Sequence, residues 1–248
     1  MKALTNLQEA FTEGKVLLLD KPLEWTSFDV VAKIRNLIRI KKVGHAGTLD
    51  PLATGLLIVC TGKFTKRINE YMGQEKEYVA TFTLGARTPT YDLESEPVPV
   101  GSPDGVTEED CVRVALGFTG DILQVPPIYS AIKQGGKPVY IMARKGQDVK
   151  LEPRPVTIRA FDILGLRLPE VDVRVVCTTG TYIRSLANDF GAALGCGAYL
   201  SALRRTRIGD SRVEDAQTVE EFVEMVRAAR DEAAGGQDDG AAGGAQKE

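Results

Sequence analysis

The sequence has few of the residues that build metal sites or disulfide frameworks. It contains one histidine, His45, and four scattered cysteines without C-x-x-C spacing, which are Cys60, Cys111, Cys177 and Cys196. A zinc site needs about four clustered nitrogen or sulfur ligands, and disulfide frameworks are typical of small secreted domains. We therefore expect no metal and no disulfide, and four cysteines that serve as small buried apolar residues.

Long apolar stretches are also missing. The longest, VLLL (16–19) and LLIVC (56–60), fall far short of the roughly 18 residues of a membrane span. The first fifteen residues, MKALTNLQEAFTEGK, lack the apolar core of a signal peptide. With 248 residues, 43% hydrophobic and 26% charged, the sequence predicts an ordinary globular protein of one to two domains that does not bind a membrane and resides in the cytoplasm.

Charge is distributed unevenly behind a net value of −3. Residues 92–121 and 214–248 each carry −7, which leaves +11 on the rest of the chain. The positive charge is concentrated in residues 33–42, 133–159 and 203–212. These segments would bind phosphates if they converged on one face, although they could equally be the solvated faces of ordinary elements.

Familiar catalytic motifs are absent. The sequence has no P-loop, no G-x-G-x-x-G, no H-E-x-x-H and no G-x-S-x-G elbow. What remains is the loop GHAGTLDPLATG (44–55), in which Asp50 is flanked by glycines. A carboxylate there can act as nucleophile or general base if an arginine keeps it ionised; the alternative is a turn residue before proline.

Three further residues are candidates, each with a structural alternative. Arg184, at the start of a helix, could pair with Asp50 or form an ordinary salt bridge. Tyr78 could stack on a flat substrate or belong to the core. His45 could contact a ligand or bond to nearby backbone.

Strands and helices alternate without a βαβ repeat, which predicts an α+β fold with one insertion. Strands are expected near 15–20, 56–60, 76–84, 156–164 and 171–178. Helices are expected after the capping-box patterns at Thr26 and Thr107, and over 64–72, 181–195 and 218–229. Residues 124–155 form a long basic segment, which we call the insertion; segments of this length between core elements are usually functional.

Six segments occur in an order that resembles a known family. They are DKP with TSFDVV (20–31), GHAGTLDPLATG (44–55), KEYVATFTLG (76–85), PPIYSAIKQGGKPVYIMARKG (126–146), GTYIRSLANDFG (180–191) and LGCGAYLSALRRTRIG (194–209). Together they resemble the bacterial tRNA pseudouridine-55 synthases, the TruB family, over about residues 14–225.

The resemblance implies the pseudouridine synthase fold, a mixed and mostly antiparallel sheet with flanking helices. It also implies isomerisation of one T-loop uridine of tRNA, without cofactor or metal. Asp50 matches the catalytic aspartate, Arg184 its partner, and Tyr78 the residue that stacks on uracil. Whether Asp50 attacks covalently or removes a ribose proton stays open at this point.

Other matched positions concern the RNA. Tyr182 and Leu203 match residues that line the same pocket, and His45 matches the residue that enters the folded T-loop. The insertion matches the family's RNA-binding "thumb". Its basic residues suit phosphate contacts, and those we select are Lys133, Lys137, Arg144 and Lys145.

The sequence departs from the family pattern at a few positions. Glu24 stands where glycine is usual, Phe64 stands where alanine is usual, and YDLESEP (91–97) lacks a glycine often found there. The C-terminal RNA-binding PUA domain is also expected to be missing. The expected domains are an N-terminal extension (1–13), a catalytic domain (14–231) and a disordered tail (232–248).

Two other functions compete with the isomerase. A tRNA-folding chaperone would need no chemistry and could coexist with it. A glycosidase would need two paired carboxylates, and no second acid lies near Asp50 in the sequence. A guide-RNA-dependent relative of the dyskerin type fits less well, because it retains the PUA domain and lacks the insertion. We expect a monomer whose partner is the T-arm of tRNA.

Overall fold

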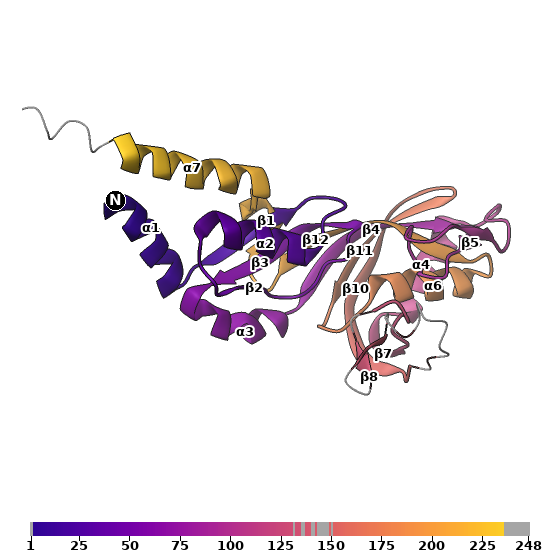
Figure 1. The fold of residues 1–248 in the computed structure, drawn as a ribbon. Coiled ribbons are helices and arrows are strands. Elements are labelled where there is room, and N and C mark those ends of the chain that lie inside the picture. Colours follow the sequence, from indigo (N-terminus) through magenta and orange to yellow (C-terminus); the bar gives the residue numbers. More distant parts are fainter. Residues whose placement is uncertain are drawn as a thin grey trace, which may run out of the picture. The chain divides into compact units, whose positions relative to one another are not determined.

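The computed structural model describes residues 2–130, 132–134, 137–139, 142, 149 and 151–235. Its tertiary contacts gather in two compact units (Figure 1). Unit 1 contains the residues up to Pro51, Gly55–Met72 and the residues from Arg212 onward. Unit 2 contains Leu52–Thr54 and Gly73–Ser211. Both units therefore draw on the expected catalytic domain 14–231.

Unit 1 is built on a small sheet covered by helices. Strand β1 (Val16–Lys21) pairs antiparallel with β3 (Ala53–Thr61) and parallel with β14 (Gln217–Thr218), while β2 (Val43–His45) pairs with the far end of β3. The helical elements are α1 (Lys2–Glu13), α2 (Ser27–Ile38), η1 (Gly62–Arg67), α3 (Ile68–Met72), η2 (Val213–Asp215) and α7 (Val219–Gly235).

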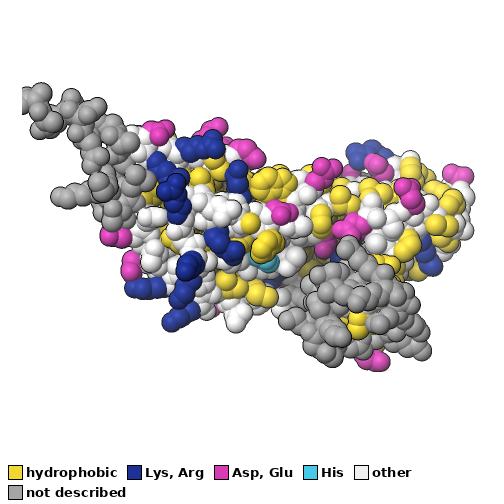
Figure 2. All heavy atoms as spheres, in the orientation of Figure 1, with side chains coloured by type: hydrophobic (Ala, Val, Ile, Leu, Met, Phe, Trp, Pro, Cys, Tyr) yellow, Lys and Arg dark blue, Asp and Glu magenta, His cyan; other side chains and the backbone are white. Residues whose placement is uncertain are grey.

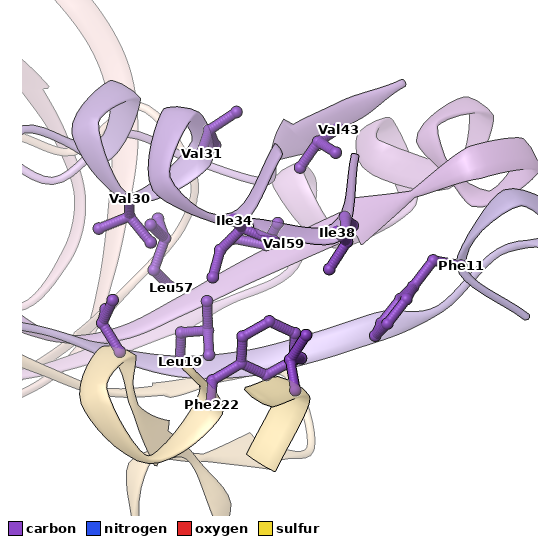
Figure 3. Packing of buried hydrophobic residues seen from close by; sticks show 12 residues of the cluster. Phe11, Leu19, Val30, Val31, Ile34, Ile38, Val43, Leu57, Val59 and Phe222 are labelled. Atoms are coloured by element: carbon purple, nitrogen blue, oxygen red, sulfur yellow. The ribbon is translucent and has the colours of Figure 1, made fainter. Parts of the chain in front are cut away.

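The start of α2 follows the predicted capping box. The Thr26 side chain accepts a hydrogen bond from the Asp29 amide, and the Asp29 carboxylate accepts one from the Thr26 amide, so two otherwise orphaned donors are satisfied. Val30 and Ile34, one helical turn apart, are fully buried against β1 and β3, with Leu19 among their neighbours (Figure 3). The expected amphipathic helix is thereby confirmed.

The N-terminal extension is part of this core, which the sequence did not predict. Phe11 of α1 is buried and meets Phe222 of α7 edge to face, with ring centroids 6.0 Å apart (Figure 3). The Thr61 hydroxyl donates to the Phe11 carbonyl oxygen at 2.8 Å. Gly62, with φ +51, lies so close to α1 that a Cβ there would be 2.0 Å from the Thr12 carbonyl oxygen.

Unit 2 is an antiparallel sheet in the order β12–β4–β11–β10–β7. Its strands are β4 (Lys76–Leu84), β7 (Gly120–Gln124), β10 (Arg154–Arg167), β11 (Glu170–Cys177) and β12 (Ala198–Ile208). The short strands are β5 (Ala86–Arg87), β6 (Val98–Pro99), β8 (Lys133–Gln134), β9 (Lys137–Pro138) and β13 (Ser211–Arg212). The parallel β1–β14 pair among antiparallel pairs confirms the predicted α+β class with mixed, mostly antiparallel pairing.

Two helices pack on the sheet of unit 2, α4 (Glu108–Gly117) and α6 (Ile183–Leu194). Phe190 of α6 lies within 5.6 Å of the ring centroids of Phe82 and Phe161, so β4, β10 and α6 share one aromatic cluster. The strand expected over 76–84 is confirmed as β4. Its side chains alternate as a half-buried strand requires, because Tyr78, Ala80, Phe82 and Leu84 are buried while Val79 is exposed.

The end of the last helix differs from the expectation, and the structure shows where the insertion joins the sheet. The helix α7 continues to Gly235, so residues 232–235 complete its last turn instead of beginning a disordered tail; residues 236–248 lie outside the described chain. The insertion begins and ends on one pair of strands, because Gln124 of β7 lies opposite Arg154 of β10. Among the described residues, no helix is long and apolar enough to cross a membrane.

Candidate functional site

Asp50 lies in a short loop between two strands of unit 1. The loop, residues 46–52, follows β2 and precedes β3, and Asp50 is half-buried while its neighbour Leu49 is buried. Gly47 in the loop and Gly55 in β3 have φ of +93 and +101, backbone angles that favour glycine. Backbone that favours glycine therefore lies on both sides of the carboxylate in the chain.

Both neighbours of Asp50 are held by side chains of other segments. The buried Ser27 hydroxyl accepts from the Leu49 amide at 2.8 Å and donates to the Leu49 carbonyl oxygen at 3.2 Å. The fully buried Lys21 ammonium donates to the Pro51 carbonyl oxygen at 3.3 Å and also to the carbonyl oxygens of Pro22 and Trp25. The Asp50 backbone is thus fixed from the end of β1 and from the start of α2.

Glu24 contributes to the same loop in a strained conformation. Its amide donates to the Pro51 carbonyl oxygen at 2.9 Å, and its φ is +65, in the left-handed region. This is the position at which the family usually has glycine. Tyr91, in the departing segment 91–97, also has a positive φ of 64. Phe64, the departure from alanine, packs its ring against Gly14, where a Cβ would lie 2.4 Å from the ring.

His45 ends β2, close to Asp50 in the chain. It is half-buried and lies opposite Val59 of β3, and the next residue, Ala46, donates its amide to the Ile58 carbonyl oxygen at 2.9 Å. The short β2 strand thus sets where the histidine leaves the sheet and where the Asp50 loop begins.

In unit 2, Tyr78 and Leu203 share one face of the sheet. Tyr78 of β4 lies opposite Arg205 of β12, and Ala80 lies opposite Leu203. Directly opposed residues of antiparallel strands point to the same side. The tyrosine and the leucine are therefore diagonal neighbours on adjacent strands, with Tyr78 buried and Leu203 half-buried.

Arg184 is buried in the first turn of α6 and has an acidic partner in its own unit. Its Nη1 lies 3.5 Å from Oδ2 of Asp92, and both side chains are 5% exposed. The same guanidinium donates to the carbonyl oxygens of Thr90 and Tyr129. Arg184 therefore forms an ordinary salt bridge, with Asp92, which was the structural alternative. The predicted pairing of Arg184 with Asp50 stays a prediction.

Tyr182 immediately precedes α6 and is bound through its backbone. Its amide donates to Oε1 of Gln124 at 2.8 Å, and its carbonyl oxygen accepts from Nε2 of Gln124 at 3.1 Å. Tyr182 and Arg184 therefore lie together at the beginning of α6, two residues apart.

Lys76 is a buried cation that begins the strand carrying Tyr78. Burial, and next the positive charge of Arg205, lower its pKa to about 8. Its ammonium donates to the Gln74 carbonyl oxygen at 2.6 Å. Arg205 is itself 1% exposed, so this face of the sheet combines an aromatic ring with two buried cations.

The predicted site residues fall into groups. Asp50 and His45 belong to unit 1, whereas Tyr78, Leu203, Tyr182 and Arg184 belong to unit 2. In the insertion, Lys133 and Lys137 lie on the paired strands β8 and β9, and Arg144 and Lys145 lie outside the described residues.

Sequence reasoning missed the residues that support these positions. Lys21 and Ser27 stand in the DKP and TSFDVV segments. Their spacing in the sequence did not show that they bind the Asp50 loop, which lies 20 to 30 residues later. Asp92 counted only as one acid of an acidic segment, and Gln124 carried no signal. Within the described residues, no group of three or more His, Cys, Asp or Glu could hold a metal ion.

Known proteins resemble the chain over most of its length. Residues 35–183 match the protein family described as "TruB family pseudouridylate synthase (N terminal domain)". Residues 184–237 match the family described as "tRNA pseudouridylate synthase B C-terminal domain". The second match covers the last part of the expected catalytic domain, including most of the motif segments 180–191 and 194–209, and the first residues of the expected tail. The tRNA pseudouridine synthase B of Flavobacterium johnsoniae is 50% identical over 88% of this chain and 99% of its own. That of Phocaeicola vulgatus is 52% identical over 87% and 94%.

Solved structures also resemble the chain over most of its length. A Cbf5–Nop10–Gar1 complex contains a chain with 32% identity and a TM-score of 0.73 over 92% of this chain, and this chain spans 58% of its length. An H/ACA RNP bound to a substrate RNA containing 2′-deoxyuridine matches with 30% identity and a TM-score of 0.69, over 91% of this chain and 57% of the other. Family descriptions that together span residues 35–237, and relatives at about half identity, agree with the motifs around Asp50 and Arg184: this chain belongs to the TruB family of pseudouridylate synthases.

Proposed function

We propose that this chain converts a uridine of tRNA to pseudouridine, and that this uridine lies in the T-loop, at position 55. The single observation that carries the proposal is the Asp50 loop, where a half-buried carboxylate stands between two residues fixed by Ser27 and Lys21. A catalytic group must be held in a defined geometry to act efficiently. The support for tRNA comes from relatives that are named tRNA pseudouridine synthase B.

The reaction breaks the bond between uracil N1 and ribose C1′ and forms a bond between C5 and C1′. The hydrogen at C5 is released as a proton, while N1 gains one. Asp50 would act on the ribose or the base during cleavage, either as nucleophile or by removing a ribose proton. No cofactor takes part in this proposal.

The base must leave its stack before any protein group can reach its glycosidic bond. We propose that Tyr78 stacks on the extruded uracil, that Tyr182 and Leu203 line its pocket, and that Arg184 keeps the reacting carboxylate ionised. His45 would occupy the space that the base leaves in the T-loop. These assignments rest on the resemblance between the motifs that contain these residues and those of the family.

The insertion would bind the RNA backbone. Lys133, Lys137, Arg144 and Lys145 supply positive charge in a segment with seven bases and two acids over 133–159. Such contacts fix the position of an RNA without reading its sequence. We further propose a monomer that acts in the cytoplasm, where its tRNA substrate resides.

The test is release of tritium from a T-arm stem-loop labelled at C5 of its uridines. Each pseudouridine formed should release one tritium to water, and mapping of the product should place it at position 55. A stem-loop with cytidine at that position is the control and should release none. A folded, RNA-binding protein that releases no tritium from the uridine substrate would contradict the proposal.

A further inference from the structure

Gln124 is a buried polar residue that makes two hydrogen bonds to one other residue. It ends β7, is 2% exposed, and uses both ends of its amide on one residue. Oε1 accepts from the Tyr182 amide at 2.8 Å and Nε2 donates to the Tyr182 carbonyl oxygen at 3.1 Å. Two bonds to one residue fix its orientation as well as its distance.

The first turn of α6 depends on this contact. Tyr182 is the N-cap residue and makes no capping bond with its own side chain. Two more bonds join the same turn to residues 125–129: the buried Ser185 hydroxyl donates to the Val125 carbonyl oxygen at 2.8 Å, and Arg184 donates to that of Tyr129 at 3.2 Å. Residues 124–129 therefore hold the start of α6 from outside the helix.

Gln124 also marks the base of the insertion. It lies opposite Arg154 in the β7–β10 ladder, and Leu123 lies opposite Pro155. The chain leaves the sheet after Gln124 and returns to the same pair of strands at Arg154. One side chain thus joins the base of the insertion to the residue that precedes α6.

We propose that Gln124 is a positioning residue that holds Tyr182, and with it the first turn of α6, against residues 125–129 at the base of the insertion. This proposal rests on the proposed function, in which the insertion binds phosphates and the start of α6 faces the extruded base. Loss of the two Gln124 bonds would free Tyr182 and the first turn of α6 to shift relative to residues 125–129. Displacements of about 1 Å at such a site can lower rates about 100-fold.

The first test replaces the amide with an apolar side chain of similar size. In Gln124→Met the single-turnover rate constant at saturating T-arm RNA should fall by about 10- to 100-fold. The dissociation constant should change less than about threefold, because the phosphate contacts of the insertion remain. Gln217→Met makes the same change at an exposed glutamine of β14 and should leave both quantities unchanged.

The second test uses a titratable replacement. In Gln124→Glu an ionised carboxylate can accept from the Tyr182 amide but repels the Tyr182 carbonyl oxygen, whereas the protonated form can make both bonds. Burial favours the protonated form. The rate of Gln124→Glu relative to the parent should therefore rise as the pH falls from 8 to 6, and the relative rate of Gln124→Met should not change.

A third measurement needs no activity. Hydrogen exchange at the Tyr182 amide, without RNA, should accelerate in Gln124→Met and not in Gln217→Met. Single-turnover rate constants in Gln124→Met that equal those of the parent would overturn the proposal. A ratio of the Gln124→Glu rate to the parent rate that does not change with pH would also overturn it. If Gln124→Met does not fold, the Gln124→Glu ratio decides. If the parent forms no pseudouridine, the proposed function fails, and the exchange rate alone decides whether Gln124 holds Tyr182.

Discussion

Asp92 and Arg184 form a buried ion pair with 3.5 Å between Oδ2 and Nη1. Removing one partner of a buried pair costs up to about 3–5 kcal/mol when the remaining charge is not compensated by other groups. We expect Asp92→Asn and Arg184→Met each to lower the free energy of unfolding substantially. The double variant should be destabilised by about 1–3 kcal/mol less than the sum of the two single effects. Urea unfolding of the four proteins measures this, and additive effects would show that the pair is not coupled.

Glu24→Gly should stabilise the protein. Glu24 has a φ of +65, a conformation that costs a non-glycine residue about 1 kcal/mol. Glycine would relieve that strain and keep the amide that donates to Pro51, although it makes the unfolded chain more flexible. We expect a net gain of about 0.5 kcal/mol in urea unfolding. Exposed Glu220, in the first turn of α7, provides the control: Glu220→Gly should destabilise the protein, and destabilisation in both variants would contradict the strain at Glu24.

The stability of the parent should depend on Lys76 in alkaline solution. Its folded pKa is about 8, below the ordinary value of 10.5, because of burial and then Arg205. Below pH 8 the lysine is charged in both states and its burial cost is fully present. Between pH 8 and 10.5 the unfolded state binds more protons, so stability from this group rises with pH. The stability of Lys76→Met minus that of the parent should therefore fall by about 1–3 kcal/mol across this window. A constant difference would show that Lys76 titrates normally.

Exposed cations of unit 1 should contribute to RNA affinity. The Lys42 carbonyl oxygen accepts from the Gly62 amide at 2.8 Å, which brings Lys41 and Lys42 next to the helical turn that carries Lys66. All three lysines are exposed, and Figure 2 shows Lys and Arg side chains gathered on the surface of this unit. Replacing them with alanine should make the negative slope of log affinity against log salt shallower, by roughly 0.7–0.9 for each phosphate that the variant no longer neutralises.

The control for that measurement is Arg113, an exposed arginine paired with Asp110 in an acidic segment. Arg113→Ala removes one positive charge from unit 2 and should leave the salt slope unchanged. Equal slopes in the lysine variant and the parent would place the RNA elsewhere.

Local sequence patterns predicted the elements of this fold well. The capping box at Thr26 and the alternation over 76–84 specify their structures through neighbouring residues, and both are confirmed. Phe11 could not be placed in the same way, because its burial depends on α7, more than 200 residues later in the chain. The end of α7 was placed too early, since small residues without apolar anchors still continued a helix that was already packed.

The site residues show the same difference between local and long-range signals. Asp50 was found because its loop is a contiguous motif. Asp92 and Gln124 were missed because each acts through a partner that the fold brings from 58 or more residues away. Contacts of that kind leave no periodic or spacing signal in a single sequence.

The most direct test of the account is Asp50→Asn, which keeps the shape of the side chain but removes its charge and its nucleophilic or basic oxygen. Single-turnover pseudouridine formation on a T-arm stem-loop should fall by at least about 1,000-fold, since a group that acts in the reaction itself contributes several kcal/mol. Affinity for the stem-loop should change far less, because it rests on phosphate contacts and stacking. A folded Asp50→Asn protein that converts the T-loop uridine at near the parent rate would contradict the assignment of the chemistry to Asp50.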